Sequence, residues 1–181
     1  MKLCHSQLVQ MANELYSFAR GVYHPKSTPH GRVVVIYGQN GCGKTHAIRA
    51  FKSWFDHVRL NIGPQVVTTE DGEDAVMPDC CYRMWPAVVD GFKRDQWLIV
   101  DALMHSYLTI IDDIGAEHDP SRIGVEKLYL ILSRREFKNT LITTNFPPGE
   151  WGNKFEQRIA SRLFRNTTHI DLSDVPDYNA P

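Results

Sequence analysis

The sequence contains no long hydrophobic run. None of its 181 residues belongs to a stretch of the roughly 18 apolar residues that a membrane-spanning helix needs. The first twenty residues carry polar side chains every few positions, which is not the pattern of a signal peptide. We therefore expect a protein that does not cross a membrane and that works in the cytoplasm.

Cysteine is scarce, and the cysteines show neither a Cys-x-x-Cys pair nor a paired histidine spacing: they are Cys4, Cys42, Cys80 and Cys81. A zinc site is therefore not expected, and the thiols should be free.

Net charge is also nearly absent, at −1, so any binding of nucleic acid needs a local basic patch. Basic residues outnumber acidic ones from 121 to 166, which fits either such a patch or an ordinary solvated surface of mixed charge.

Hydrophobic residues make up 43% of the chain, enough for one globular core, and their spacing alternates between strand and helix patterns. Helices are predicted at 6–20, 46–55, from Pro86, at 97–104, 122–136 and 156–164, and strands at 32–37, 80–84, 107–111, 139–143 and 168–172. The stretch 57–79 reads as an inserted loop or hairpin, with a turn at Asp71-Gly72. Strands that alternate with helices predict a parallel sheet covered on both faces, an α/β/α three-layer sandwich. We divide the chain into an N-terminal helix and linker (1–31), a core (32–172) and a tail (173–181).

One glycine-rich segment matches the pattern G-x-x-x-x-G-K-[ST] and lies between a predicted buried strand and a helix. Its backbone N–H groups are expected to surround the phosphates of ATP, and Lys44 is expected to bridge the β- and γ-phosphates. The Thr45 hydroxyl is expected to bind Mg²⁺. The predicted ATP-binding residues are Gly38, Gln39, Asn40, Gly41, Cys42, Gly43, Lys44, Thr45 and His46.

Two later strands end in polar side chains. Asp112 and Asp113 follow an apolar strand, the arrangement of a Walker B motif, and Asn145 follows the next strand. We expect Asp112 to lie beside Thr45 and to hold Mg²⁺ through a water molecule, and Asp113 to orient or deprotonate the attacking water. Asn145 is expected to sense the γ-phosphate, although an asparagine at this place also suits a turn before Phe146-Pro147.

Three segments together, GQNGCGKTH, IIDDIGAE and TLITTNFPPGEW, resemble the AAA+ ATPases, and most closely the bacterial replicative helicase loaders of the DnaC and IstB type. The resemblance runs from about Val33 to Leu172 and implies a P-loop ATPase that works as a homo-oligomer. It places an arginine finger at Arg162, accompanied by Arg158, that reaches the ATP of a neighbouring subunit. The chain differs from typical loaders because one helix and a linker precede the first strand and no helical lid follows the last.

The leading hypothesis is an ATP-hydrolysing replication accessory protein that acts on single-stranded DNA and a replicative helicase. Arg134, Arg135 and Lys138, near a helix end, are candidates for contacts with DNA phosphates. Arg134, Arg135 and Arg158, the last on the helix that carries the predicted finger, are candidates for a DNA or subunit interface. An IstB-type regulator of transposition, a superfamily 3 helicase, a small-molecule kinase and a non-hydrolysing switch remain as alternatives. Hydrolysis should be slow, because Asp113 is one methylene shorter than the glutamate of many AAA+ proteins. Chain position alone suggests residues 22–24 for the adenine pocket.

Overall fold

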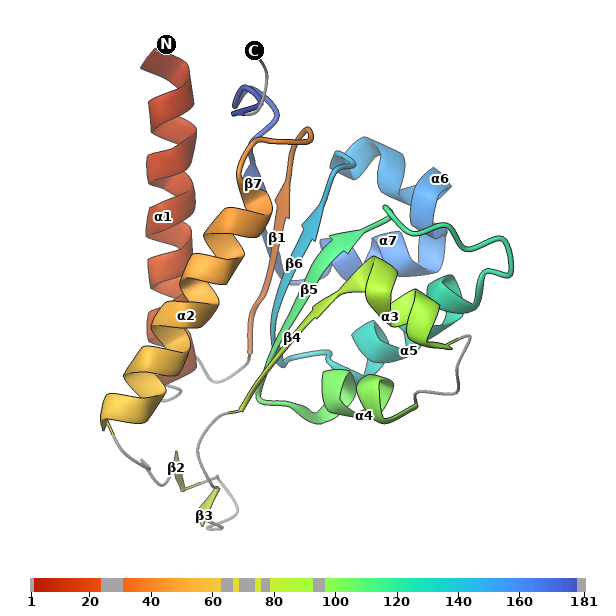
Figure 1. Cartoon of the computed structure of the whole chain (residues 1–181), viewed down its shortest axis with the longest axis horizontal. Coiled ribbons are helices and arrows are strands. Elements are labelled where there is room, and N and C mark those ends of the chain that lie inside the picture. Colours follow the sequence, from red (N-terminus) through yellow and green to blue (C-terminus); the bar gives the residue numbers. More distant parts are fainter. Residues whose placement is uncertain are drawn as a thin grey trace.

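The computed structural model describes residues 2–23, 31–62, 67–68, 74–75, 79–92 and 97–178. Its centre is a five-stranded sheet in the order β4-β5-β6-β1-β7, with every neighbouring pair parallel (Figure 1). The strands are β1 (Val33–Tyr37), β4 (Cys80–Met84), β5 (Leu108–Ile114), β6 (Asn139–Thr144) and β7 (Thr167–Asp171). A separate antiparallel pair, β2 (Val67–Thr68) and β3 (Asp74–Ala75), lies in the stretch for which the sequence allowed a hairpin. The Asp71-Gly72 turn lies outside the described residues.

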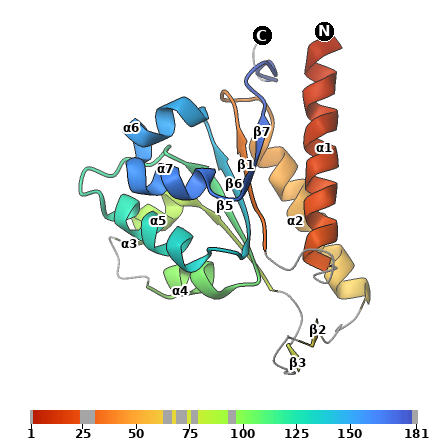
Figure 2. The same cartoon turned by 180° about the vertical axis from the view of Figure 1, so that it is seen from behind.

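Helices cover both faces of the sheet. On one face lie α1 (Lys2–Tyr23) and α2 (Lys44–Ile62), and on the other α3 (Trp85–Phe92), α4 (Trp97–His105), α5 (Ile123–Arg134), α6 (Trp151–Phe155) and α7 (Gln157–Phe164) (Figure 1 and Figure 2). A short 3₁₀ helix, Pro148–Glu150, precedes α6. The predicted three-layer α/β/α fold is confirmed.

The alternation of side chains along β1 shows how the strand serves both layers. Val34 and Ile36 pack in the cluster that contains Phe18 of α1, whereas Val35 packs in the cluster on the opposite face. All three β1 side chains are fully buried, as expected for a central parallel strand of β-branched residues. Helix α1 thus packs on the same face of the sheet as α2. Among the described residues, no helix combines the length and apolar character that a membrane span requires.

Several element boundaries differ from the predictions. Helix α2 begins at Lys44 and continues to Ile62, so it is longer at both ends than the predicted helix 46–55. Its buried Ile48, Phe51 and Phe55 form one apolar stripe on the sheet. Strand β5 continues to Ile114, so that both carboxylates belong to it. Helix α6 was not predicted, because the run 147–149 indicated a loop; Trp151 and Phe155 anchor it in the core.

Arg135 is not a DNA-facing residue, which corrects the prediction. Its side chain is 1% exposed, and its guanidinium donates hydrogen bonds to the carbonyl oxygens of Ser106 at 2.7 Å and Asn139 at 2.5 Å, and to Thr140 Oγ1 at 2.9 Å. Burial lowers the pKa of Arg135 to about 10, which leaves it charged at neutral pH. Arg135 therefore joins the end of α5 to the segments that lead into β5 and β6.

Replacing Arg135 with alanine is expected to lower the free energy of unfolding by about 3 kcal/mol, because the carbonyls that it satisfies would be left buried without a donor. The matched control is its exposed neighbour, and Arg134→Ala should change the free energy of unfolding by no more than about 0.5 kcal/mol. Urea unfolding followed by circular dichroism measures both. Equal and small shifts of the two midpoints would contradict the structural role of Arg135.

Candidate active site

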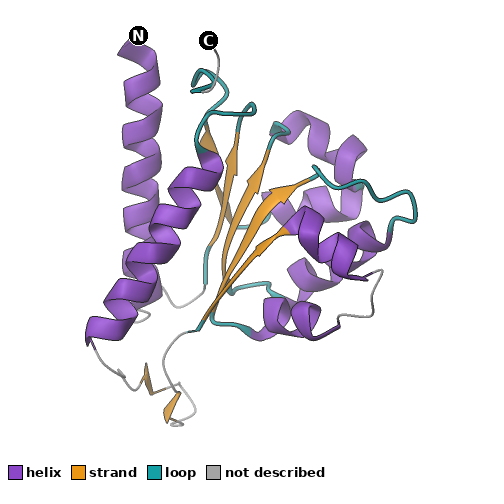
Figure 3. Cartoon of the chain, in the orientation of Figure 1, coloured by secondary structure: helices purple, strands orange, loops and turns teal. Residues whose placement is uncertain are grey.

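The glycine-rich segment 38–45, called loop 38–45 here, follows β1, and its last two residues are the first two of α2. It lies at the edge of the sheet where the parallel strands end (Figure 3). Lys44, the first residue of α2, folds back over this loop and is 7% exposed. Its Nζ donates to the carbonyl oxygens of Gly38 at 2.7 Å and Gln39 at 2.8 Å. The loop thus holds a positive charge at its centre, beside the N-terminal end of a long helix.

Asp112 is fully buried near the end of β5, and hydroxyl groups surround its carboxylate. Its Oδ1 accepts hydrogen bonds from Thr45 Oγ1 at 3.2 Å and from Thr143 Oγ1 at 2.5 Å. Its Oδ2 accepts one from the Tyr82 hydroxyl at 2.9 Å. The structure therefore brings Thr45 and Asp112 together, and the three donors compensate for the burial of the carboxylate.

Asp113 points into the site because β5 is irregular at this residue. The register against β6 shifts between Ile111 and Ile114, and Asp113 has a φ of 64°, an unusual value for a residue with a side chain. The Asp113 N–H donates to Thr143 Oγ1 at 2.8 Å, and Asn145 Nδ2 donates to Asp113 Oδ1 at 3.0 Å. Burial and the nearby Asp112 carboxylate raise the pKa of Asp113, while Lys44 and the Asn145 hydrogen bond oppose this rise. The local strain thus lets two consecutive carboxylates serve one site.

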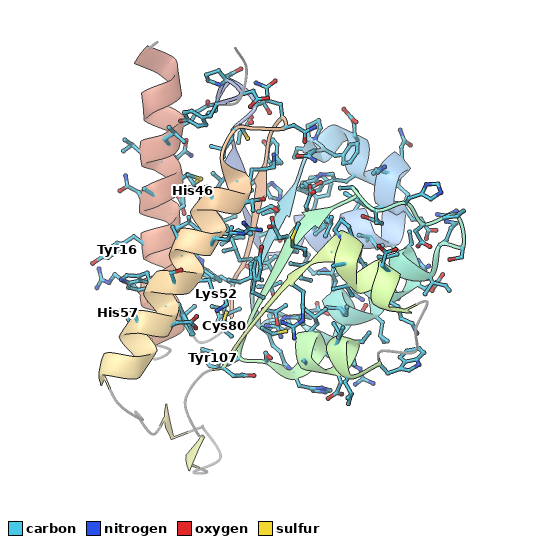
Figure 4. The ribbon with its side chains drawn as sticks, viewed as in Figure 1. Tyr16, His46, Lys52, His57, Cys80 and Tyr107 are labelled. Carbon is cyan, nitrogen blue, oxygen red and sulfur yellow. The ribbon has the colours of Figure 1, made fainter. Side chains whose placement is uncertain are left out.

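Lys44, Thr45, Asp113 and Asn145 line a pocket of about 580 Å³, and Asp112 is not among its lining residues. The lining combines the loop, the start of α2, the ends of β5 and β6, and the segment after β7: it comprises Asn40, Gly41, Gly43, Lys44, Thr45, His46, Asp113, Asn145 and Tyr178. His46 lies on the first turn of α2, at the end of that helix nearest the loop (Figure 4). Six of the nine predicted ATP-binding residues line this cavity together with Asp113 and Asn145, whereas Gly38, Gln39 and Cys42 are not among the lining residues.

Two tyrosines of the site were missed by the sequence predictions. Tyr82, on β4, donates its hydroxyl to Asp112 and accepts a hydrogen bond from Arg49 Nε at 3.3 Å. Burial is the main cause that raises the pKa of Tyr82. Tyr178 reaches the pocket from the predicted tail. Their sequence neighbourhoods carry no motif; only the order of the strands and the return of the chain after β7 reveal them.

The predicted finger residues lie outside this pocket of their own chain. Arg162 Nη1 donates to Glu136 Oε2 at 2.7 Å, and Arg165 donates to the other oxygen of the same carboxylate at 2.9 Å. Arg158 pairs with Glu126 and Glu156. A hollow next to Arg162 also includes Gly31 and Val33, which lie at the start of β1, the far end of the strand from the loop.

Val22 does not contribute to a nucleotide pocket, which corrects the suggestion for residues 22–24. It is buried against the sheet, and its carbonyl accepts a hydrogen bond from the Tyr107 hydroxyl at 2.7 Å. Tyr107 lies at the edge of the sheet opposite the loop and His46 (Figure 4). The Tyr23 side chain and His24 lie outside the described residues.

The fold is similar to those of several solved replication proteins. DnaI matches with a TM-score of 0.65 at 20% identity, over 91% of this chain and 82% of DnaI. Domain III of the Thermotoga maritima replication initiation protein DnaA matches with a TM-score of 0.57 at 16% identity, over 88% of this chain and 61% of the other. The Aeropyrum pernix Orc1 protein, solved in complex with DNA, matches with a TM-score of 0.52 at 15% identity, over 88% and 44%.

The chain thus spans less than two thirds of the DnaA and Orc1 chains. No family model matches the sequence, and neither does any curated protein. The likeness therefore concerns the fold. On the fold, the structural comparison agrees with the resemblance drawn from the sequence motifs. This chain has a three-layer α/β/α fold that is similar to those of DnaI and of domain III of DnaA.

Proposed function

We propose that the chain binds and hydrolyses ATP in the pocket beside loop 38–45. One observation carries the proposal: Lys44, Thr45, Asp113 and Asn145, predicted from three separate motifs, line a single cavity of about 580 Å³. That size suits a nucleotide, since small-molecule sites commonly measure about 300–1,000 Å³. A DnaA solved with AMPPCP, an ATP analogue, has a similar fold at 17% identity and a TM-score of 0.55.

Lys44 and the loop bind the phosphates in this proposal. The ammonium group already lies at the centre of the loop. A bound phosphate would therefore accept hydrogen bonds from an ammonium group that now donates to the Gly38 and Gln39 carbonyls. The N–H groups of the loop and the N-terminal end of α2 favour an anion at the same place. Binding therefore needs no large displacement of Lys44.

Thr45 and Asp112 suit a magnesium ion, because a hydroxyl and a carboxylate oxygen lie 3.2 Å apart at the floor of the site. Mg²⁺ prefers oxygen ligands and retains several waters, so two protein oxygens are an ordinary contribution. When bound, the ion would neutralise charge on the phosphates during hydrolysis. Thr143 and Tyr82 fix the Asp112 carboxylate in the orientation that meets Thr45.

Asp113 acts on the attacking water in this proposal. Its carboxylate faces the pocket, and the Asn145 amide orients it through the 3.0 Å hydrogen bond. A raised pKa makes a carboxylate a stronger base. Burial raises the pKa of Asp113 and therefore favours its role as a general base. Asn145 lines the pocket and donates a hydrogen bond to Asp113, and this position suits a sensor of the terminal phosphate.

We further propose that hydrolysis serves DNA replication, through action on single-stranded DNA and a replicative helicase. The fold likeness to DnaI and to replication initiators supports this role. Of the basic residues predicted for DNA or subunit contacts, Arg134 and Lys138 are exposed, while Arg135 is removed from the set. Regulation of a transposase is the second candidate, because the IstB-type resemblance rests on the same motifs.

Changing Asp113 to asparagine is expected to lower ATP hydrolysis by about a hundredfold while ATP still binds, because the amide retains the size of the carboxylate but cannot accept a proton. Phosphate release, with and without single-stranded DNA, and equilibrium ATP binding measure the two effects. Asp101→Asn, at an exposed position on α4, is the matched control. An unchanged rate in the Asp113 variant would contradict the assigned base.

The same variant identifies the partner, because it should hold ATP without turnover. Affinity capture in the presence of ATP is expected to recover a replicative helicase. Recovery of a transposase instead would transfer the proposal to transposition.

A further inference from the structure

The segment after β7, Ser173–Tyr178, returns to the loop that follows β1; we call it the returning segment. The Leu172 N–H donates to the Tyr37 carbonyl at 2.8 Å, and the Tyr178 N–H donates to the Gly41 carbonyl at 3.1 Å. Between these points Gln39 Nε2 donates to the Val175 carbonyl at 2.8 Å. Val175 is fully buried in the core. The returning segment is therefore attached to loop 38–45 along its length, and both views show it beside that loop (Figure 1 and Figure 2).

Gly41 of the loop leaves the space that the Asp177 side chain of the returning segment occupies. Gly41 and Gly43 have φ values of 75° and 95°, and a Cβ on Gly41 would lie 1.6 Å from Asp177 Oδ1. A Cβ on Gly43 would lie 3.6 Å from Tyr178 Cε2, which is van der Waals distance. The Tyr178 ring thus lies directly against the loop, and it is 62% exposed, so much of its surface is open to the pocket and to solvent.

The order of the strands indicates how a nucleotide would be oriented in the pocket. In the sheet, β5 and β6 lie on one side of β1, and β7 lies on the other. Asp113 and Asn145 come from β5 and the end of β6, whereas Tyr178 comes from the segment after β7. With the terminal phosphate of a nucleotide beside Asp113 and Asn145, the triphosphate follows the loop, and the nucleoside leaves it on the side of β7.

We propose that Tyr178 forms the nucleoside side of this pocket and that its ring stacks on the base of the bound nucleoside triphosphate. The inference rests on the proposed function and adds to it the residue that holds the nucleoside. An aromatic ring is suited to this contact, because every base presents a π-face. The hydrogen bonds of Gln39 and of the Tyr178 N–H fix the segment, so that little ordering accompanies binding.

The test compares a ligand that has a nucleoside with one that lacks it, AMPPCP and inorganic tripolyphosphate, by titration calorimetry. Tyr178→Ala is expected to raise the Kd of AMPPCP about tenfold and to change that of tripolyphosphate by less than about twofold. Tyr178→Phe should bind both ligands as the unchanged chain does, because the ring is retained. Tyr16→Ala is the matched control, since Tyr16 is 64% exposed and lies on α1, away from the pocket (Figure 4).

Unchanged tripolyphosphate binding also shows that the Tyr178→Ala chain is folded. Equal weakening of the two ligands, or unchanged AMPPCP binding, would overturn the stacking role while the proposed function stands. If the unchanged chain bound neither ligand, the proposed function would fail and this inference with it.

Discussion

Replacing Lys44 with alanine is expected to reduce ATP hydrolysis by about a thousandfold and to abolish measurable ATP binding at micromolar concentrations. Lys44 is the only lysine or arginine among the described residues that line the pocket. Its ammonium group is held at the centre of the loop by the Gly38 and Gln39 carbonyls, where a phosphate would compete for it. Phosphate release and calorimetric titration with ATP measure the two losses.

The control for this variant is Lys52→Ala, on the same helix α2 and facing Asp56 instead of the pocket. Circular dichroism checks that Lys44→Ala retains the fold, since the variant also removes the hydrogen bonds that Lys44 donates to the Gly38 and Gln39 carbonyls and to Cys42 Sγ. An equal effect of the two substitutions, or ATP affinity that is unchanged in Lys44→Ala, would refute the nucleotide site.

The predictions from sequence succeeded where the residues of the site stand within short sequence motifs. The polar residues that follow an apolar strand mark its carboxyl end, and the carboxyl ends of parallel strands meet at one edge of a sheet. This rule, together with the Walker B arrangement downstream of the glycine-rich loop, predicted that Asp112 lies beside Thr45, and the structure places Asp112 Oδ1 3.2 Å from Thr45 Oγ1. It also predicted that Asp113 and Asn145 share a site, and the structure joins them by a hydrogen bond.

The predictions were incomplete where a contact depends on which strands are neighbours. Tyr82 reaches Asp112 only because β4 pairs with β5, with Met84 opposite Asp112 in the register. Tyr178 reaches Gly43 only because the chain turns back after β7. Neither residue stands in a local pattern that predicts such a contact, since a tyrosine in a strand or near a proline is ordinary.

Burial of a charged residue was the other source of error. Arg134 and Arg135 are adjacent and identical, so composition assigns them the same role. At the end of a helix, however, consecutive side chains point about 100° apart, so one can face solvent while the other enters the core. The carbonyl oxygens around Arg135 come from the segment before β5 and from the first residue of β6, and the sequence does not show that these segments converge.

Changing Arg162 to alanine is expected to lower ATP hydrolysis by about a thousandfold while ATP binding remains, if Arg162 is the finger of a neighbouring subunit. Within its own chain Arg162 does not line the pocket; it pairs with Glu136 and lies over the ring of Tyr129, with 5.9 Å between the guanidinium carbon and the ring centroid. A finger role would therefore require that Arg162 exchange its Glu136 contact for a phosphate contact on assembly. A guanidinium group suits both partners, because its charge is permanent and it forks onto paired oxygens.

Complementation distinguishes a finger from a structural ion pair. Lys44→Ala retains Arg162, and Arg162→Ala retains the pocket, so a mixture of the two inactive chains should recover part of the activity through mixed assemblies. Arg165→Ala is the matched control, because Arg165 pairs with the same Glu136 carboxylate and should leave hydrolysis nearly unchanged. If Arg162→Ala and Arg165→Ala lower hydrolysis and stability alike, and mixing restores nothing, Arg162 serves to attach α7 to the end of α5 and the finger lies elsewhere.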